Sequence, residues 1–231
     1  MMTVHHLNNS RSQRVLWLLE ELGLPYEVKR YERDAKTMLA PPSLRAVHPL
    51  GKSPVITDGD ITLAESGAII EYVVERYGGG RLVPAPSTEE RLRYRYWLHY
   101  AEGSAMPPLL LALIFQQIPR GPMPALIRPI VGRIAHAVQA NFVEPQVALH
   151  LNYMEGELEK RTWFAGSEFS AADIQMSFPV EAAAARVGLD ASRPALSAFL
   201  ERVHARPAYK RALERGGPFE VAGGKQVRRG S

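Results

Sequence analysis

The sequence predicts a small α/β domain followed by an all-helical domain. Two observations concern the first part: residues 3–31 fit a strand, a helix and a second strand, and "PVITDGDITL" at residues 54–63 has the pattern of a β-hairpin. The third is that every periodic segment after the Gly- and Pro-rich residues 78–87 has helical spacing. A length of 231 residues suits two small domains.

The first three predicted elements form a βαβ unit. Residues 3–7 include β-branched side chains, and residues 26–31 alternate as a strand does. Between them, apolar side chains recur at helical spacing over residues 15–22, and Gly23 with Pro25 ends this helix. A unit of this kind joins two parallel strands through a helix.

The remainder of the first domain adds a hairpin and a helix. Pro41 and Pro42 interrupt residues 34–47, for which we predict an irregular helix or a loop. The turn "DGD" joins two short strands, and a helix over residues 69–77 ends at three glycines. The order β-α-β-α-β-β-α is that of the thioredoxin-like fold. We therefore predict a thioredoxin-like domain at residues 1–79 and a linker at residues 80–87.

The second domain, residues 88–220, is predicted to be an all-α helical bundle. Two capping boxes, Ser87 with Glu90 and Ser170 with Asp173, mark helix starts. The helix after the second box is apolar on nearly every face, so we expect it at the centre of this domain. Prolines at residues 107–108 and 119–124 are expected to kink or divide the helical material. Other helices are predicted at residues 125–141, 143–161, 196–206 and 208–215, and a flexible tail at residues 221–231.

Composition narrows the class of protein. There is no cysteine, which excludes disulfides and thiolate chemistry of the protein's own and fits a reducing compartment. The net charge of +4 is spread thinly, so we expect no nucleic-acid partner. No apolar stretch is long enough for a membrane span or a signal peptide, so we predict a cytoplasmic protein without a membrane partner. The seven histidines form no ligand motif, and we predict no metal site.

Three stretches carry a resemblance to a known family: "SRSQRVLWLLEELGLPYE", "HPLGKSPVITDGDITLAESGAIIEYV" and "FAGSEFSAADI". With this domain order, the chain resembles the glutathione transferase superfamily, in particular its bacterial, theta-like or yeast-like members. The resemblance implies glutathione as co-substrate, a small hydrophobic electrophile as second substrate and a homodimer.

The resemblance also implies how glutathione binds. In the family the bond before the proline at the position of Pro54 is cis, which turns the backbone of Ser53 outward to pair with the cysteinyl part of an extended tripeptide. Glu65 and Ser66 come at the start of a helix, whose free N–H groups and positive dipole end favour the γ-glutamyl carboxylate. Lys52 is expected to reach the glycyl carboxylate or the thiolate side of the ligand, and His48 is expected near the glycyl end. Taken singly, each of these residues also has an ordinary structural role as a cap, a first-turn charge or a loop residue.

Activation of the glutathione thiol needs a hydrogen-bond donor, because the thiolate is the nucleophile. The family places a Tyr, Ser or Cys after the first strand, and here that loop has neither Tyr nor Cys. The candidates are Ser10 and Asn9, then Ser12, which also fits as a helix cap. Arg11 is expected to add positive potential or to be a solvated cation.

On the helical domain, Tyr100 and Ser104 are one turn apart and face the glutathione site in the family, so they are predicted to line the electrophile pocket. Core packing or a dimer interface is the other interpretation of this aromatic segment. The predicted function is transfer of glutathione to a small electrophile. Two alternatives remain open: a glutathione-dependent disulfide-bond reductase or peroxidase, and a binding or regulatory module without activity.

Overall fold

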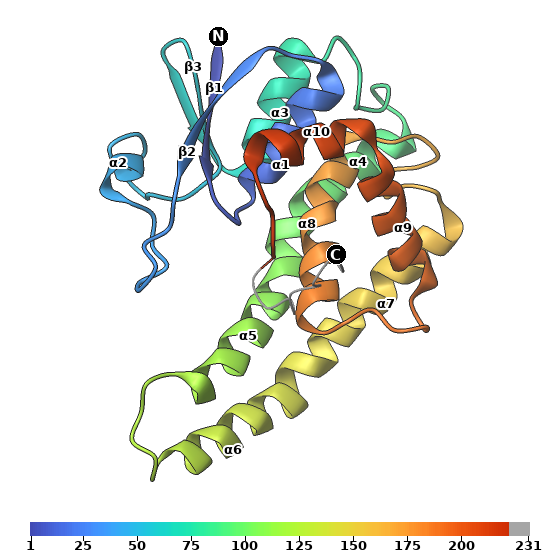
Figure 1. The fold of residues 1–231 in the computed structure, drawn as a ribbon. Coiled ribbons are helices and arrows are strands. Elements are labelled where there is room, and N and C mark those ends of the chain that lie inside the picture. Colours follow the sequence, from blue (N-terminus) through green and yellow to red (C-terminus); the bar gives the residue numbers. More distant parts are fainter. Residues whose placement is uncertain (222–231) are drawn as a thin grey trace, which may run out of the picture.

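The structure, a computed structural model, describes residues 1–221 and contains the two predicted domains (Figure 1). The N-terminal domain has a four-stranded sheet in the order β2-β1-β3-β4. Strand β1 (Met2–Leu7) pairs in parallel with β2 (Tyr26–Tyr31) and antiparallel with β3 (Val55–Asp58), which forms the predicted hairpin with β4 (Ile61–Ala64). Residues 222–231, most of the predicted tail, lie outside the described residues.

Helices cover both faces of this sheet. α1 (Ser12–Leu22) and α3 (Ser66–Tyr77) pack together on one face (Figure 1). The short α2 (Pro42–Arg45) lies on the other, where Leu44 packs with side chains of β1 and β2. Gly23 ends α1 in the left-handed conformation that glycine adopts without strain.

The C-terminal domain is helical throughout the part that the structure describes. Its α-helices are α4 (Glu89–Tyr100), α5 (Met106–Gln117), α6 (Arg128–Val138), α7 (Glu144–Lys160), α8 (Ala171–Arg186), α9 (Pro194–Ala205) and α10 (Pro207–Gly216). Two π-helical turns, η1 (Ala101–Ala105) and η3 (Gln139–Val143), join α4 to α5 and α6 to α7, and the 3₁₀ turn η2 (Ile118–Arg120) follows α5. As predicted, α8 is buried along most of its length and starts at a capping box of Ser170 and Asp173.

Some local predictions are wrong. The cap of α4 is Thr88, whose hydroxyl oxygen accepts the N–H of Arg91 at 3.2 Å, and not the neighbouring Ser87. Helix α1 includes Ser12 as its first residue, so Arg11 takes the cap position. The prolines at 107–108 lie in the first turn of α5, where a missing N–H costs little, and the π-helical turn η1 divides α4 from α5 directly before them. The two helices predicted over residues 125–161 are present as α6 and α7, and the π-helical turn η3 joins them.

The first and last helices hold the two domains together. α10 packs along α1, where the rings of Trp17 and Tyr209 meet edge to face at 5.2 Å. Arg206 donates to both carboxylate oxygens of Glu21, at 2.5 and 2.9 Å. The start of the chain is therefore completed by a helix from its other end.

Candidate active site

The predicted strand-opening proline lies where β3 begins next to β1. The peptide bond between Ser53 and Pro54 is cis, as the resemblance implies. The hydroxyl of Ser53 donates to the carbonyl oxygen of His5 at 2.9 Å and accepts the N–H of Leu7 at 3.3 Å. These two bonds fix Ser53 against the end of β1, beside the loop that carries the thiol-activating candidates.

Ser10 lies at the centre of a small hydroxyl network. Its Oγ is 2.7 Å from Oγ of Ser12 and 3.3 Å from Oγ of Ser53, and it accepts the N–H of Ser12 at 3.3 Å. Ser10 is 5% exposed and is therefore shielded from open solvent. The structure thus brings Ser10 and the Ser53–Pro54 turn together.

The two other thiol candidates have different surroundings. Asn9 is exposed, with a φ of 50°, and its Oδ1 accepts the N–H of Glu220 at 2.9 Å. Ser12 is fully buried, and its hydroxyl is 2.8 Å from Nδ1 of His6. Of the three candidates, Ser10 has a side-chain hydrogen bond to Ser53, whereas Asn9 contacts Glu220 and Ser12 contacts His6.

His6 is a member of this network that sequence reasoning did not single out. Burial and, to a smaller extent, the charge of Arg30 lower the pKa of His6 to about 4 against the opposing effect of a hydrogen bond with the backbone of Gly216. The ring is therefore neutral at pH 7, and a neutral Nδ1 without hydrogen can accept the Ser12 hydroxyl.

This shift predicts a dependence of stability on pH. Between the ordinary His value of 6.5 and about 4, the unfolded chain binds a proton at residue 6 that the folded chain does not. The free energy of unfolding should therefore fall by at most about 3 kcal/mol as the pH drops through this window. Urea titrations at several pH values should show that the free energy of unfolding of His6→Asn falls less steeply with decreasing pH than that of the parent chain. Replacement of the exposed His99 is the control, and parallel curves for the parent and His6→Asn would contradict the prediction.

Ser66 begins α3 and meets a buried arginine from α1. Nη2 of Arg14 donates to Oγ of Ser66 at 3.1 Å, and Nη1 donates to the carbonyl oxygen of Gln175 in α8 at 2.6 Å. Nη2 is also 2.5 Å from Oε1 of Glu102 in η1. Because Arg14 occupies a lone pair of the Ser66 oxygen, the Ser66 hydrogen stays available for an incoming acceptor.

Glu102 is shared by two arginines. Nε of Arg11 is 2.9 and 3.1 Å from its two carboxylate oxygens. The two guanidinium groups lower the pKa of Glu102 against the opposing effect of burial. Both guanidinium carbons lie over the ring of Phe178, at 4.8 Å for Arg11 and 5.1 Å for Arg14. Arg11 is thus a paired cation close to the loop of Ser10, and not a free solvated one.

The other predicted glutathione residues are Glu65, Lys52 and His48. Glu65 precedes α3 with a φ of 73° and a ψ of 122°, a conformation that is strained for a residue with a side chain, and it is exposed. Lys52 is exposed next to Ser53. Nδ1 of His48 is buried without a hydrogen-bond partner among residues 1–221. Backbone strain and an unpaired buried nitrogen are features that concentrate at binding sites.

The structure places Tyr100 and Ser104 differently from each other. The ring of Tyr100 is 7% exposed and packs among Trp97 and Tyr153, and its hydroxyl is 2.6 Å from Nδ1 of His150. Ser104 is half-buried in η1, two residues from Glu102. Their assignment to the electrophile pocket stays a prediction, and packing accounts for Tyr100.

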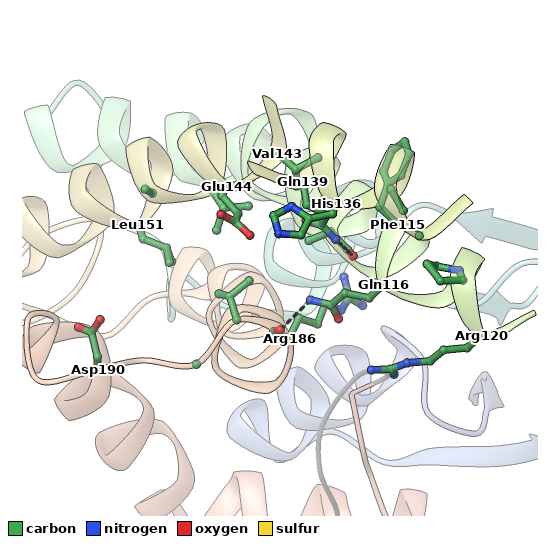
Figure 2. A pocket seen from close by; sticks show the side chains of 18 of the residues that line it. Phe115, Gln116, Arg120, His136, Gln139, Val143, Glu144, Leu151, Arg186 and Asp190 are labelled. Carbon is green, nitrogen blue, oxygen red and sulfur yellow. Dashed lines mark hydrogen bonds between the residues drawn. The ribbon is translucent and has the colours of Figure 1, made fainter. Parts of the chain in front are cut away.

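A cavity of about 690 Å³ lies between α5, α6, α7 and the end of α8 (Figure 2). Phe115, Val143 and Leu151 contribute apolar surface, and Gln116 donates to the carbonyl oxygen of Arg186 at its edge. Neither Tyr100 nor Ser104 lines it, nor does any residue predicted to bind glutathione. Within residues 1–221, no group of three His, Cys, Asp or Glu side chains is arranged to hold a metal ion.

Comparison with known proteins identifies the family. Residues 1–75 match the family described as "Glutathione S-transferase, N-terminal domain", and residues 123–207 match "Glutathione S-transferase, C-terminal domain". With these two domains in this order and with close relatives, the chain belongs to the glutathione transferase superfamily.

Two yeast proteins and one solved structure are among its relatives. The chain is 38% identical over 184 residues to glutathione S-transferase 3 of Schizosaccharomyces pombe, covering 79% of this chain and 74% of that protein. It is 33% identical over 220 residues to glutathione S-transferase 1 of Saccharomyces cerevisiae, covering 92% and 94%. A crystal structure of a glutathione S-transferase from Actinobacillus pleuropneumoniae has a TM-score of 0.79 at 35% identity, covering 100% of this chain and 97% of the other.

Proposed function

We propose that this protein is a glutathione transferase in which the Ser10 hydroxyl stabilises the thiolate of glutathione for attack on a small electrophile. The observation that carries the proposal is the contact between Ser10 and Ser53 beside the Pro54 turn, within a loop that also begins α1. A hydroxyl donor at the N-terminus of a helix lowers the pKa of a nearby thiol.

The tripeptide would lie extended from the start of α3 to the loop of His48. Ser66 would donate its hydroxyl hydrogen, oriented by Arg14, to the γ-glutamyl carboxylate, and Glu65 would accept from the γ-glutamyl ammonium. Ser53 would pair with the cysteinyl backbone, and Lys52 and His48 would reach the glycyl carboxylate. A sphingomonad relative, 26% identical with a TM-score of 0.71 over 93% of this chain and 98% of its own, was solved in complex with glutathione, which supports this ligand.

The reaction needs only groups of this chain and its two substrates. The bound thiolate attacks an electrophilic carbon, a carbon–sulfur bond forms, and the leaving group departs with the bonding electrons. Ser10 holds the thiolate before attack, and its own proton is not consumed. Detoxification of small apolar electrophiles in the cytoplasm fits a reduced co-substrate and a chain with no cysteine to oxidise.

A homodimer is part of the proposal. Leu92 and Tyr96 of α4 and Leu149 and Tyr153 of α7 are exposed, and the rings of Tyr96 and Tyr153 contact each other at 6.4 Å. An exposed apolar face of this kind is typical of a surface that a second subunit covers.

The decisive experiment compares Ser10→Ala with Asn9→Ala. The pKa of the bound glutathione thiol, followed by the ultraviolet absorbance of the thiolate, should rise by about one to two units in Ser10→Ala because a charge-assisted hydrogen bond is lost. Asn9→Ala should leave it nearly unchanged. The reverse pattern would transfer the role to Asn9, and no change in either variant would contradict thiol activation by this loop.

Two further assays separate the alternatives. Turnover of a halonitrobenzene supports the transferase, whereas turnover of hydroxyethyl disulfide alone would indicate a reductase. Calorimetry with glutathione tests binding itself, since a chain that takes up no glutathione at millimolar concentration would be a binding module for something else.

A further inference from the structure

An arm of residues 103–143, which runs from the end of η1 through α5, η2 and α6 to the end of η3, extends away from the sheet domain (Figure 1). Its residues 103–143 contain no Asp or Glu, whereas they contain Arg120, Arg128 and Arg133. These three arginines are all exposed, and they give residues 103–143 a net charge of +3. The arm is therefore a basic surface with no acid of its own to neutralise it.

The same arm exposes large apolar side chains. Leu126 is 90% exposed, and Ile130 and Ile134 are each 59% exposed. Ile127, Ile130 and Ile134 recur at helical spacing on one face of α6, and Ile114 and Ile118 are exposed along α5 and η2. This set of exposed residues, Ile114, Ile118, Leu126, Ile127, Ile130 and Ile134, is called the arm face below.

We propose that the arm face docks on the surface of a membrane that contains anionic lipids. Apolar side chains beside arginines, without acids, are the composition of helices that lie in the membrane interface. The leucine and isoleucines would enter the boundary between headgroups and acyl chains, and the long arginine side chains would reach the phosphates. The proposed association is peripheral. Among residues 1–221, no helix is long and apolar enough to cross a bilayer.

A second copy of this chain fits the arm face less well. A two-fold contact with its axis through the arm face brings the two copies of the arm together. It would crowd Arg120, Arg128 and Arg133 of both copies, with no Asp or Glu from residues 103–143 to pair with them. Like charges in a dry interface are costly, whereas an anionic leaflet supplies the missing negative charge.

The test is co-sedimentation of the full chain with vesicles. The parent protein should bind vesicles of phosphatidylcholine with phosphatidylglycerol, bind pure phosphatidylcholine far more weakly, and be released by salt. The variant Ile130→Ser with Arg133→Gln should bind at least about tenfold more weakly, since it removes apolar area and one charge. Leu39→Ser with Lys36→Gln, an exposed apolar residue and a cation outside the arm, should bind as the parent does.

Three results would overturn the proposal. The parent could fail to bind anionic vesicles, or the arm variant could bind as well as the parent. The arm variant could also change the mass of the protein in solution while vesicle binding is absent, which would assign the arm face to contacts between copies. Both variants should remain folded, because all four substituted side chains are exposed. Unfolding curves of the two variants check this.

Discussion

Replacing Asp173 with alanine is expected to lower the free energy of unfolding by about 3–5 kcal/mol. Oδ1 of Asp173 accepts the N–H of Phe164 at 2.8 Å, and Oδ2 accepts the N–H and the hydroxyl of Ser170 at 2.9 and 3.0 Å. The residue is fully buried where α8 starts. Alanine would leave three donors in the core without an acceptor, and each would keep its desolvation penalty.

Burial raises the pKa of Asp173 to about 6. The measurement is therefore urea unfolding at about pH 8, where Asp173 is ionised. Asp173→Asn retains one carbonyl oxygen, so its free energy of unfolding should lie between those of the parent and the alanine variant. Asp190 is the matched control: it is exposed and accepts the N–H of Ser192 at 2.9 Å, so Asp190→Ala should cost less than about 1 kcal/mol. Equal losses at both aspartates would contradict the structural role given to Asp173.

Arg14→Met is expected to be the second large effect, again about 3–5 kcal/mol in unfolding free energy. The side chain is 2% exposed, and its guanidinium joins Ser66 of α3, Gln175 of α8 and Glu102 of η1. Methionine would leave the Gln175 carbonyl and part of the Glu102 carboxylate without a partner. The same substitution should raise the dissociation constant of glutathione, because Ser66 would lose the donor that orients it.

Arg11→Met is the matched control for Arg14→Met. Arg11 binds the same carboxylate but is 35% exposed, so Arg11→Met should lower the free energy of unfolding by less than about 1 kcal/mol. Because Arg14 and Glu102 contact each other, Arg14→Met with Glu102→Gln should cost less than the sum of the single variants. Strict additivity in the double-mutant cycle would show that the two charges are not coupled.

The fold was predictable where its signals are local. The end of α1 at Gly23, the hairpin around "DGD" and the start of α8 at Ser170 each depend on residues within a few positions of one another, and all three are present. The cap of α4 was missed by one residue, because Ser87 and Thr88 offer the same hydroxyl and the backbone conformation decides between them. The π-helical turns were not predictable, because helical spacing alone does not reveal one extra residue in a turn.

The candidate site was predictable only in part. Ser10, Ser53, Glu65 and Ser66 lie in short stretches that resemble the family. The pair of Arg14 and Glu102 was missed because 88 positions separate the two residues along the chain. A signal was present, since Arg14 is four and eight positions before Leu18 and Leu22 and so places a charge inside the apolar stripe of α1.

The packing of α10 on α1 has a consequence for biosynthesis. On a translating ribosome the sheet and α1 emerge well before their partners, since Arg206 follows Glu21 by 185 positions and Tyr209 packs on Trp17. The N-terminal domain therefore exposes part of its apolar surface until α10 has been synthesised, and a chaperone that shields such surface would have its longest opportunity on this domain.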